Sequence, residues 1–354
     1  MKSILFYFGH PAQFLFAKNT INKLQGKGHN VLIFIRSKDI LEELIVSSGL
    51  NFQNILSDGR KDTTSGIILG VIKRGIRLYH LVKNNKVDIM VGTDPTLAHV
   101  GKLFGVPVIT TLEDDADIIP KLARITFPFT THIFTPNVCK VGKKYESKKL
   151  AYEGYMKLAY LHPVYFKPDH TKVQSCESPY ILIRLAKLTA HHDDDITGID
   201  LSFIDDLLEV VKGNYKIYIN SEYELSGRYE QYRLKTNPSD IHHILFYSSL
   251  FISDSQSMTV EAAVLGTPSI RYSSFAGRIS VLEELEKKYL LTHSITPPAK
   301  EELLETAKSM LYQNDIKALY QSRRKKMLSE KIDVTELLTD LIDRYPLSLA
   351  RFRD

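Results

Sequence analysis

The sequence predicts an α/β protein built from two doubly wound parallel-sheet halves. Its 354 residues exceed the usual size of one compact domain, so two domains are expected. Strand-like and helix-like segments alternate along the chain, which is the order of a parallel sheet with crossover helices. The first strand-like segment, residues 4–8, is a continuous apolar run, as expected of a parallel strand covered on both faces.

The elements of the first half follow from apolar spacing and from glycine signals. Phe16, Ile21 and Leu24 share one face of a predicted helix over residues 12–25, and Gly-Lys-Gly at 26–28 ends it. A polar loop is expected near residues 58–66. The predicted strands are 4–8, 31–35, 87–91, 106–112 and 133–134, and the predicted helices are 12–25, 40–46, 67–86 and 95–104.

A second half begins after residues 167–179, which hold two prolines and mostly polar residues and therefore predict an interdomain linker. We expect domains over 1–166 and 180–330, and a C-terminal helix within 331–354 that packs back on the first domain. The predicted strands of this half are 180–185, 216–219, 250–253 and 269–272, and the predicted helices are 201–211, 241–248, 258–265, 301–328 and 335–345.

Composition excludes several classes of protein. An apolar fraction of 44% and a charged fraction of 25% are typical of a globular chain and not of a disordered or fibrous one. The net charge of +5 suits anionic small ligands and does not require nucleic acid. Cys139 and Cys176 have no metal or redox spacing, so a reduced, cytoplasmic location is expected. The sequence contains no run of about eighteen apolar residues, so no membrane-spanning helix is predicted.

The most informative segment is 253–270, where a strand ends in small hydroxyl residues that open onto a helix. Backbone N–H groups at a helix N-terminus favour an anion such as a phosphate. A carboxylate at Glu261 would pair with vicinal hydroxyls, as on a ribose. The alternative is a helix capped by Ser257 with Glu261 as a solvated charge. On spacing alone the two interpretations weigh equally.

This segment resembles the donor signature of GT-B glycosyltransferases and of the UDP-N-acetylglucosamine 2-epimerase group. Nearly end to end, the chain also resembles a bacterial and archaeal family of unknown function related to that superfamily. The resemblance implies a GT-B fold, with two Rossmann-like domains facing across a cleft. It rests on Gly28-His29, on residues 154–163 (GYMKLAYLHP), on Ile183-Arg184 with residues 190–193 (AHHD), and on Glu261-Ala262-Ala263 with residues 266–269 (GTPS).

The resemblance assigns roles in the second half. Glu261 matches the ribose-binding glutamate, and a phosphate loop is expected where relatives often carry glycines, although this chain has none between 253 and 265. Arg184 would offset the diphosphate charge. His191 or His192 would be an acid–base group, since the epimerase group carries a histidine in a comparable loop. The alternative for His191 is an exposed polar loop, and no metal site is expected. The complete expected nucleotide-sugar set is Arg184, Ser255, Gln256, Ser257, Met258, Thr259 and Glu261.

Three residues that follow predicted strands of the first half are further candidates. His10 is the expected general base toward an acceptor hydroxyl, and its alternative role is to cap the first helix. Asp94 and Glu113 would supply carboxylates to an epimerase, and Asp94 alternatively caps the helix that begins at Pro95. Lysines and arginines along residues 73–83 suit contact with an anionic membrane, or alternatively form a solvated face.

The leading functional hypothesis is a metal-independent glycosyltransferase of surface polysaccharide biosynthesis. It would move a sugar from a nucleotide-sugar donor, expected to be UDP-linked, to a glycan or lipid-linked acceptor. No separate cofactor is expected, and the protein would be cytoplasmic or peripheral on the inner face of the membrane. One alternative is a nucleotide-sugar 2-epimerase or hydrolase, and another is a non-catalytic nucleotide-sugar binding subunit. The oligomeric state stays open.

Overall fold

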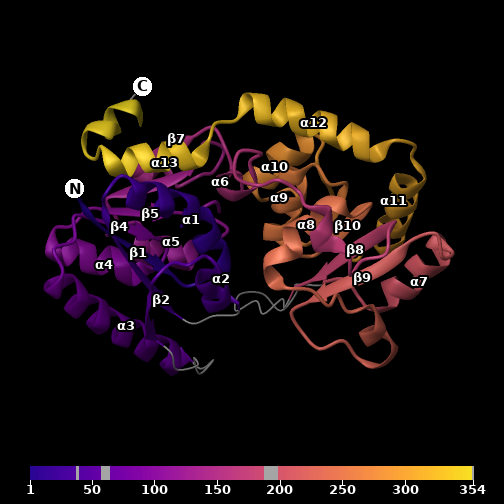
Figure 1. The fold of residues 1–354 in the computed structure, drawn as a ribbon, viewed down its shortest axis with the longest axis horizontal. Coiled ribbons are helices and arrows are strands. Elements are labelled where there is room, and N and C mark those ends of the chain that lie inside the picture. The colour runs from indigo at the N-terminus through magenta and orange to yellow at the C-terminus, as the bar shows by residue number, and fades with distance from the viewer. Residues whose placement is uncertain (37–39, 57–63, 187–197, 353–354) are drawn as a thin grey trace. The chain divides into compact units, whose positions relative to one another are not determined.

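The computed structural model describes residues 1–36, 40–56, 64–186 and 198–352, which form two units (Figure 1). The first unit combines residues 1–160 with 332–354, and the second spans residues 161–331. Each unit is built on one sheet in which every paired strand is parallel to its neighbours. The prediction of two parallel-sheet α/β units is therefore confirmed.

The sheet of the first unit has the strand order β3-β2-β1-β4-β5-β6-β7. The chain winds outward from β1 to β3 and then returns to place β4 beside β1, so the winding direction reverses between these two strands. The strands are β1 (Ser3–Phe8), β2 (Asn30–Arg36), β3 (Gln53–Leu56), β4 (Ile89–Gly92), β5 (Val108–Thr111), β6 (His132–Pro136) and β7 (Lys149–Tyr152). The helices are α1 (Pro11–Gly26), α2 (Leu41–Ser47), α3 (Thr64–Asn84), α4 (Pro95–Phe104), α5 (Pro120–Thr126) and, at the boundary of the units, α6 (Leu158–Leu161).

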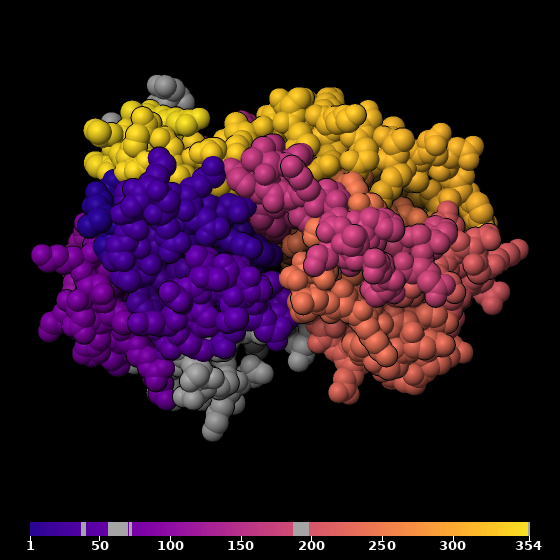
Figure 2. All heavy atoms as spheres, viewed as in Figure 1, coloured from indigo at the N-terminus to yellow at the C-terminus, as the bar shows by residue number. Residues whose placement is uncertain are grey.

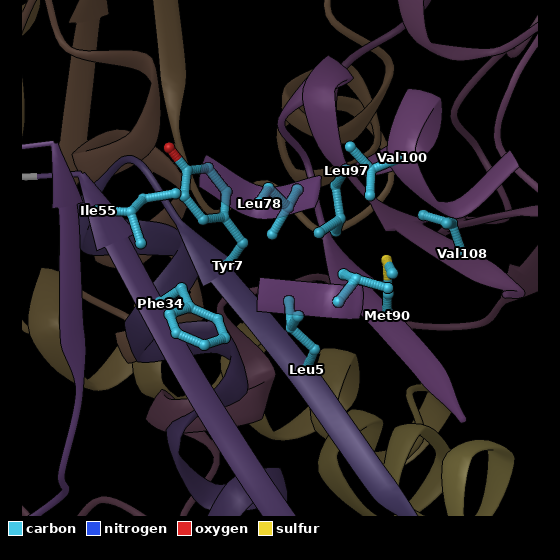
Figure 3. Packing of buried hydrophobic residues seen from close by; sticks show 10 residues of the cluster. Leu5, Tyr7, Phe34, Ile55, Leu78, Met90, Leu97, Val100 and Val108 are labelled. Atoms are coloured by element: carbon cyan, nitrogen blue, oxygen red, sulfur yellow. The ribbon is translucent and has the colours of Figure 1, made fainter. Parts of the chain in front are cut away.

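One core cluster of the first unit lies between this sheet and helices on one of its faces. Buried side chains from β1, β2, β4 and β5 pack there against side chains of α3 and α4. Figure 3 shows the ring of Tyr7 packed in this cluster, with its hydroxyl pointing away from Leu5 and Phe34. Leu78, Leu97 and Tyr7 are fully buried, so this packing fixes the ends of β1 and β4 that carry the loops described below.

The C-terminal residues complete the first unit. Helix α13 (Val334–Asp343) packs against α1, and the yellow C-terminal residues lie next to the indigo N-terminal ones in Figure 2. His29 explains one motif noted in the sequence, because its Nδ1 accepts a hydrogen bond from the Lys2 N–H at 3.0 Å and its Nε2 lies 2.9 Å from Asp343 Oδ1. The C-terminal segment thus belongs to the first unit.

The sheet of the second unit has the order β12-β11-β10-β8-β9. The chain passes from β8 to β9 on one side and then to β10 on the other, so its winding reverses between β8 and β10. The strands are β8 (Tyr180–Leu185), β9 (Lys216–Ser221), β10 (Leu250–Ser253), β11 (Ser269–Tyr272) and β12 (His293–Ile295). The helices are α7 (Ser202–Val211), α8 (Ile241–Tyr247), α9 (Gln256–Leu265), α10 (Ser280–Lys287), α11 (Lys300–Tyr312) and α12 (Ile316–Glu330).

Residues 167–179, expected to be a linker, instead belong to the second unit. The Asp169 N–H donates to His243 Nδ1 at 3.0 Å, and the rings of Phe166 and His243 lie 4.8 Å apart. This local packing on α8 is why the unit begins at residue 161 rather than at 180. The helix predicted over 301–328 is two helices, separated by Asp315 at φ 57°. The expected loop at 58–66 lies largely outside the described residues, and α3 begins at Thr64.

Two helical glycines test the packing of the first unit. A Cβ at Gly101 on α4 would lie 2.1 Å from Val108 Cγ2 and 3.0 Å from the Val106 carbonyl oxygen, whereas a Cβ at Gly75 on α3 would meet no atom within 4 Å. Gly101→Ala should therefore lower the free energy of unfolding by about 1–3 kcal/mol through overpacking. Gly75→Ala should raise it by about 0.5–1 kcal/mol through helix propensity. Urea unfolding followed by circular dichroism measures both, and equal effects would contradict the α4–β5 packing.

Candidate functional site

His10 follows β1 at the point where the winding of the first sheet reverses, which is where open α/β sheets bind ligands. Its side chain caps α1, because Nδ1 accepts a hydrogen bond from the Ala12 N–H at 3.2 Å. Gln13 Oε1 supports the same turn by accepting the Gly9 N–H at 2.9 Å. A neutral imidazole has one acceptor nitrogen, so in this pose Nε2 carries the proton. The base role expected of His10 stays a prediction, and it requires the ring to release the cap.

Asp94 follows β4, the strand beside β1, and it caps α4. Its Oδ1 accepts the Thr96 N–H at 2.9 Å and the Thr96 hydroxyl at 2.6 Å, and its Oδ2 lies 3.6 Å from Arg74 Nε. Arg74 is therefore buried rather than part of a solvated basic face. Burial, reinforced by the charge of Asp94, raises the pKa of the nearby Tyr7 hydroxyl. The capping alternative for Asp94 is thus realised, and its carboxylate is fixed in place.

Glu113 comes two residues after β5 and is held by a segment near β7. Its Oε2 lies 3.2 Å from Lys157 Nζ, and its Oε1 accepts the Met156 N–H at 2.6 Å. The Glu113 and Lys157 side chains are only 12% and 8% exposed. Lys157 belongs to the motif at residues 154–163, which carried no assigned role from sequence. Its function in the structure is to hold Glu113.

The structure brings His10, Asp94 and Glu113 to one edge of one sheet. They follow β1, β4 and β5, which are consecutive in the sheet and parallel. Neighbouring strands lie about 4.8 Å apart, so the three backbones are separated by roughly one or two strand spacings at the carboxyl edge. This arrangement suits groups that act on one small ligand.

In the second unit, α9 opens at the carboxyl end of β10, beside the reversal between β8 and β10. The cap is Ser255 rather than Ser257. Ser255 Oγ accepts the Met258 N–H at 3.5 Å, and the Thr259 hydroxyl donates to the Ser255 carbonyl oxygen at 2.7 Å. Gln256, Ser257 and Met258 are half-buried on the first turn. Among the described residues, no hydrogen bond engages the side chains of Gln256 and Ser257, so both remain open to a ligand.

Glu261 is buried on α9, so the alternative that it is a solvated charge is wrong. The residue is 5% exposed, and its Oε1 lies 3.4 Å from His242 Nε2 on α8. His242 could not be found from local spacing, because β10 separates α8 from α9 in the sequence. Helix α8 therefore holds the carboxylate that the ribose interpretation requires.

Arg184 lies near the end of β8 and is already engaged. Its guanidinium bonds the side chains of Asn220 and Glu222, which come from the end of β9 and just beyond it. A surface hollow of about 560 Å³ adjoins this pair and is lined by Ser221, Glu222, Tyr223, Glu224, Leu225, Glu230 and Arg233. Its three carboxylates disfavour a diphosphate. Arg184 must exchange Glu222 for a diphosphate if it is to take the expected role.

Asp254 connects the ends of β8 and β10, the two strands between which the winding of the second sheet reverses. It follows β10, and its Oδ1 accepts the Ala186 N–H from beyond β8 at 2.7 Å, while its Oδ2 faces the Ile199 N–H at 3.4 Å. Burial raises the pKa of this carboxyl to about 6, although the backbone hydrogen bonds oppose the shift. Asp254 thus fixes the backbone on both sides of the segment that contains His191, and it was not among the expected site residues.

His191 itself lies outside the described residues. Within the part of the chain that the structure describes, no group of three or more His, Cys, Asp or Glu side chains is arranged to hold a metal ion. No helix among the described residues is long and apolar enough to cross a membrane.

Asp254 makes stability depend on pH. Its folded pKa of about 6 exceeds the ordinary 3.8, so between these values the folded state binds more protons than the unfolded state. Its contribution is fully present below about pH 4 and is lost as the pH rises through 6. Two pKa units correspond to about 3 kcal/mol at most. Asp254→Asn should remove this part of the decline.

The measurement is urea unfolding of wild type and Asp254→Asn at four pH values between about 4.5 and 7.5. Circular dichroism is the suitable probe, since the chain contains no tryptophan. Other carboxyls titrate equally in both proteins, so the difference between the two curves isolates Asp254. Parallel curves would show that this carboxyl keeps its ordinary pKa.

Comparisons with known proteins agree with this geometry at the level of the fold. The S. aureus MnaA structure with UDP matches with a TM-score of 0.72 and 12% identity over 99% of this chain and 98% of that one. A UDP-GlcNAc 2-epimerase from Neisseria meningitidis, bound to UDP-GlcNAc, matches at 0.65 and 12% over 99% and 100%. The spinosyn forosaminyltransferase SpnP matches at 0.66 and 12% over 97% and 100%. The chain thus has the fold shared by GT-B glycosyltransferases and these epimerases, as expected.

Sequence comparison adds the family. No curated protein matches the chain. A family model described as a protein of unknown function, DUF354, matches residues 9–345. Because that match covers nearly the whole sequence, the chain belongs to the DUF354 family.

Proposed function

We propose that this protein is a metal-independent glycosyltransferase that moves a sugar from a UDP-linked donor to an acceptor hydroxyl. The observation that carries the proposal is the buried carboxylate of Glu261, held by His242 on the helix whose N-terminus opens where the second sheet reverses its winding. Burying a carboxylate is unfavourable unless it has a partner. A site that keeps such a group beside a helix N-terminus is suited to a ligand with both hydroxyls and phosphates.

The donor would bind to the second unit. The diphosphate would meet the first N–H groups of α9 and the open side chains of Gln256 and Ser257, because the helix N-terminus carries a partial positive charge. Glu261 would accept hydrogen bonds from the ribose hydroxyls. The diphosphate needs no metal if α9 and Arg184 together balance its charge as the sugar leaves.

The acceptor chemistry would take place at the first unit. His10, Asp94 and Glu113 follow consecutive strands there, so one hydroxyl-bearing ligand can contact more than one of them. A glycan or lipid-linked acceptor of surface polysaccharide biosynthesis, with peripheral contact to the inner membrane surface, fits this proposal. Basic residues such as Lys73, which is exposed on α3, support the membrane contact.

A second candidate is a nucleotide-sugar 2-epimerase or hydrolase. The observation that favours it is the pair of carboxylates, Asp94 and Glu113, that follow adjacent strands β4 and β5. The fold likeness to the 2-epimerases also supports it. An epimerase would use these two groups on the sugar, together with His191. Product analysis separates the candidates, because transfer joins the sugar to an acceptor, hydrolysis frees it and epimerisation leaves it on the nucleotide.

Nucleotide binding should stabilise the folded protein. A ligand that binds only the folded state raises the Tm, so UDP should raise it more than GDP, CDP or dTDP, with or without magnesium. Glu261→Gln should weaken UDP binding by roughly 10- to 100-fold, because a hydrogen bond to a charged group contributes about 1.5–3 kcal/mol. Thermal-shift titration measures both effects.

Glu305→Gln is the matched control, since Glu305 is an exposed carboxylate on α11 in the same unit and pairs across the helix surface with Lys308. It should bind UDP like the wild type. The proposal fails if no nucleotide raises the Tm. A non-catalytic binding subunit would be indicated by a Tm shift without turnover of any nucleotide sugar.

A further inference from the structure

Three consecutive carboxylates follow β5 at the carboxyl edge of the first sheet, the edge that also carries His10 and Asp94. They are Glu113, Asp114 and Asp115. Strand β5 lies beside β4, and β4 lies beside β1. Residues directly after β5 are therefore within about two strand spacings of those after β1. A carboxylate at this edge is well placed to exchange a proton with a ligand, provided that the fold has not already committed it.

Two of the three carboxylates already form hydrogen bonds or an ion pair within the protein. Glu113 contacts Lys157 Nζ at 3.2 Å and the Met156 N–H at 2.6 Å. Asp115 is 1% exposed, and its Oδ1 accepts the Lys140 N–H at 2.8 Å. Both side chains hold loops together, and each would leave a buried donor unsatisfied if it moved away.

Asp114 is different from its two neighbours. It is partly exposed, and no hydrogen bond to its side chain occurs among the described residues. The charged and titratable groups that face it are Glu113 and Asp115 on its own segment, Lys157 from the β7–α6 connection, and the buried thiol of Cys139 after β6. Burial, followed by the charge of Glu113, raises the pKa of Asp114 to about 6, against the lowering effect of Lys157.

We propose that Asp114 is the catalytic residue that accepts the proton of the acceptor hydroxyl. In the step, the acceptor oxygen bonds to the anomeric carbon as the bond from that carbon to the diphosphate oxygen breaks. The electron pair of the broken bond leaves on the nucleoside diphosphate. The hydroxyl proton passes to the Asp114 carboxylate and from there to solvent. The inference rests on the proposed function and names the base within it.

The chemistry favours Asp114 over His10 for this role. His10 uses its one neutral acceptor nitrogen to cap α1, whereas none of the described residues forms a hydrogen bond with the Asp114 oxygens. A general base works best when its pKa lies near the working pH, because it is then ionised and still basic. A carboxyl with an ordinary pKa near 3.8 would be a much weaker base at neutral pH.

The test compares Asp114→Asn with two matched variants. His10→Asn keeps a good capping residue and removes the imidazole, and Asp117→Asn removes an exposed carboxylate of the same acidic segment. The donor is the nucleotide sugar that raises the Tm most, and the readout is nucleoside diphosphate release with and without a sugar acceptor. UDP affinity and the Tm of each variant are measured alongside.

Asp114→Asn should lower kcat by about 10²- to 10⁴-fold and leave the UDP Kd within about twofold. Wild-type kcat/KM should fall below about pH 6, and this acidic limb should vanish in Asp114→Asn and persist in His10→Asn and Asp117→Asn. Formate should restore part of the activity of Asp114→Ala, because a small carboxylate can replace the missing base. A purely structural role for Asp114 would allow neither the loss of the limb nor the rescue.

The inference is overturned if Asp114→Asn turns over like the wild type, or if His10→Asn is the variant that loses the limb. It is also overturned if formate fails to rescue a folded Asp114→Ala protein. These results differ from failure of the proposed function, in which the wild type itself neither binds nor turns over any nucleotide sugar. That outcome would remove both proposals together.

Discussion

The parallel direction of the strands in each sheet is the constraint on which the candidate residues of both units depend. A chain that builds a parallel sheet leaves each strand at the same edge and returns across a face through a helix. Residues as distant in sequence as His10 and Glu113 therefore reach one edge of one sheet. Where the winding reverses, the flanking helices lie on opposite faces and leave room for a ligand. In the second unit, Asp254 spans this position and Ser255 begins the helix there.

Side chains at this edge are needed both to cap helices and to contact a ligand. Each helix that starts there has N–H groups without partners, which must be met by a side chain, by water or by a ligand. His10, Asp94 and Ser255 all serve as caps. Asp94 accepts at 2.9 Å and 2.6 Å, whereas the Ser255 cap is long at 3.5 Å. The N-terminus of α9 is thus less satisfied by its own chain than that of α4, and it is the better place for an anion.

Sequence patterns revealed the central strands and most of the helices, although α5, α6 and α10 were not predicted, and they missed the strands β3, β7 and β12. All three lie at sheet edges and span only three or four residues, so they have one neighbour each and lack the apolar run of a central strand. The site shows a similar limit. Motifs pointed to Asp94, Glu113 and Glu261, but their partners Arg74, Lys157 and His242 come from other elements. Whether a carboxylate has a hydrogen-bond or ion-pair partner depends on how the elements pack, and local sequence spacing does not show this.

Burial alone does not identify a catalytic carboxyl, as Asp254 and Asp114 illustrate. Burial raises the pKa of both to about 6. Asp254 accepts backbone N–H groups from two segments, so movement of this group would cost the backbone its partners. Among the described residues, none forms a hydrogen bond with the Asp114 side chain, and its neighbours act on it through their charges. Glu113 and Asp115 favour its protonated form, and Lys157 favours its ionised form. A carboxyl between opposing charges can gain or lose a proton with little structural consequence, as proton transfer requires. A carboxyl that holds two backbone segments together must instead stay in place.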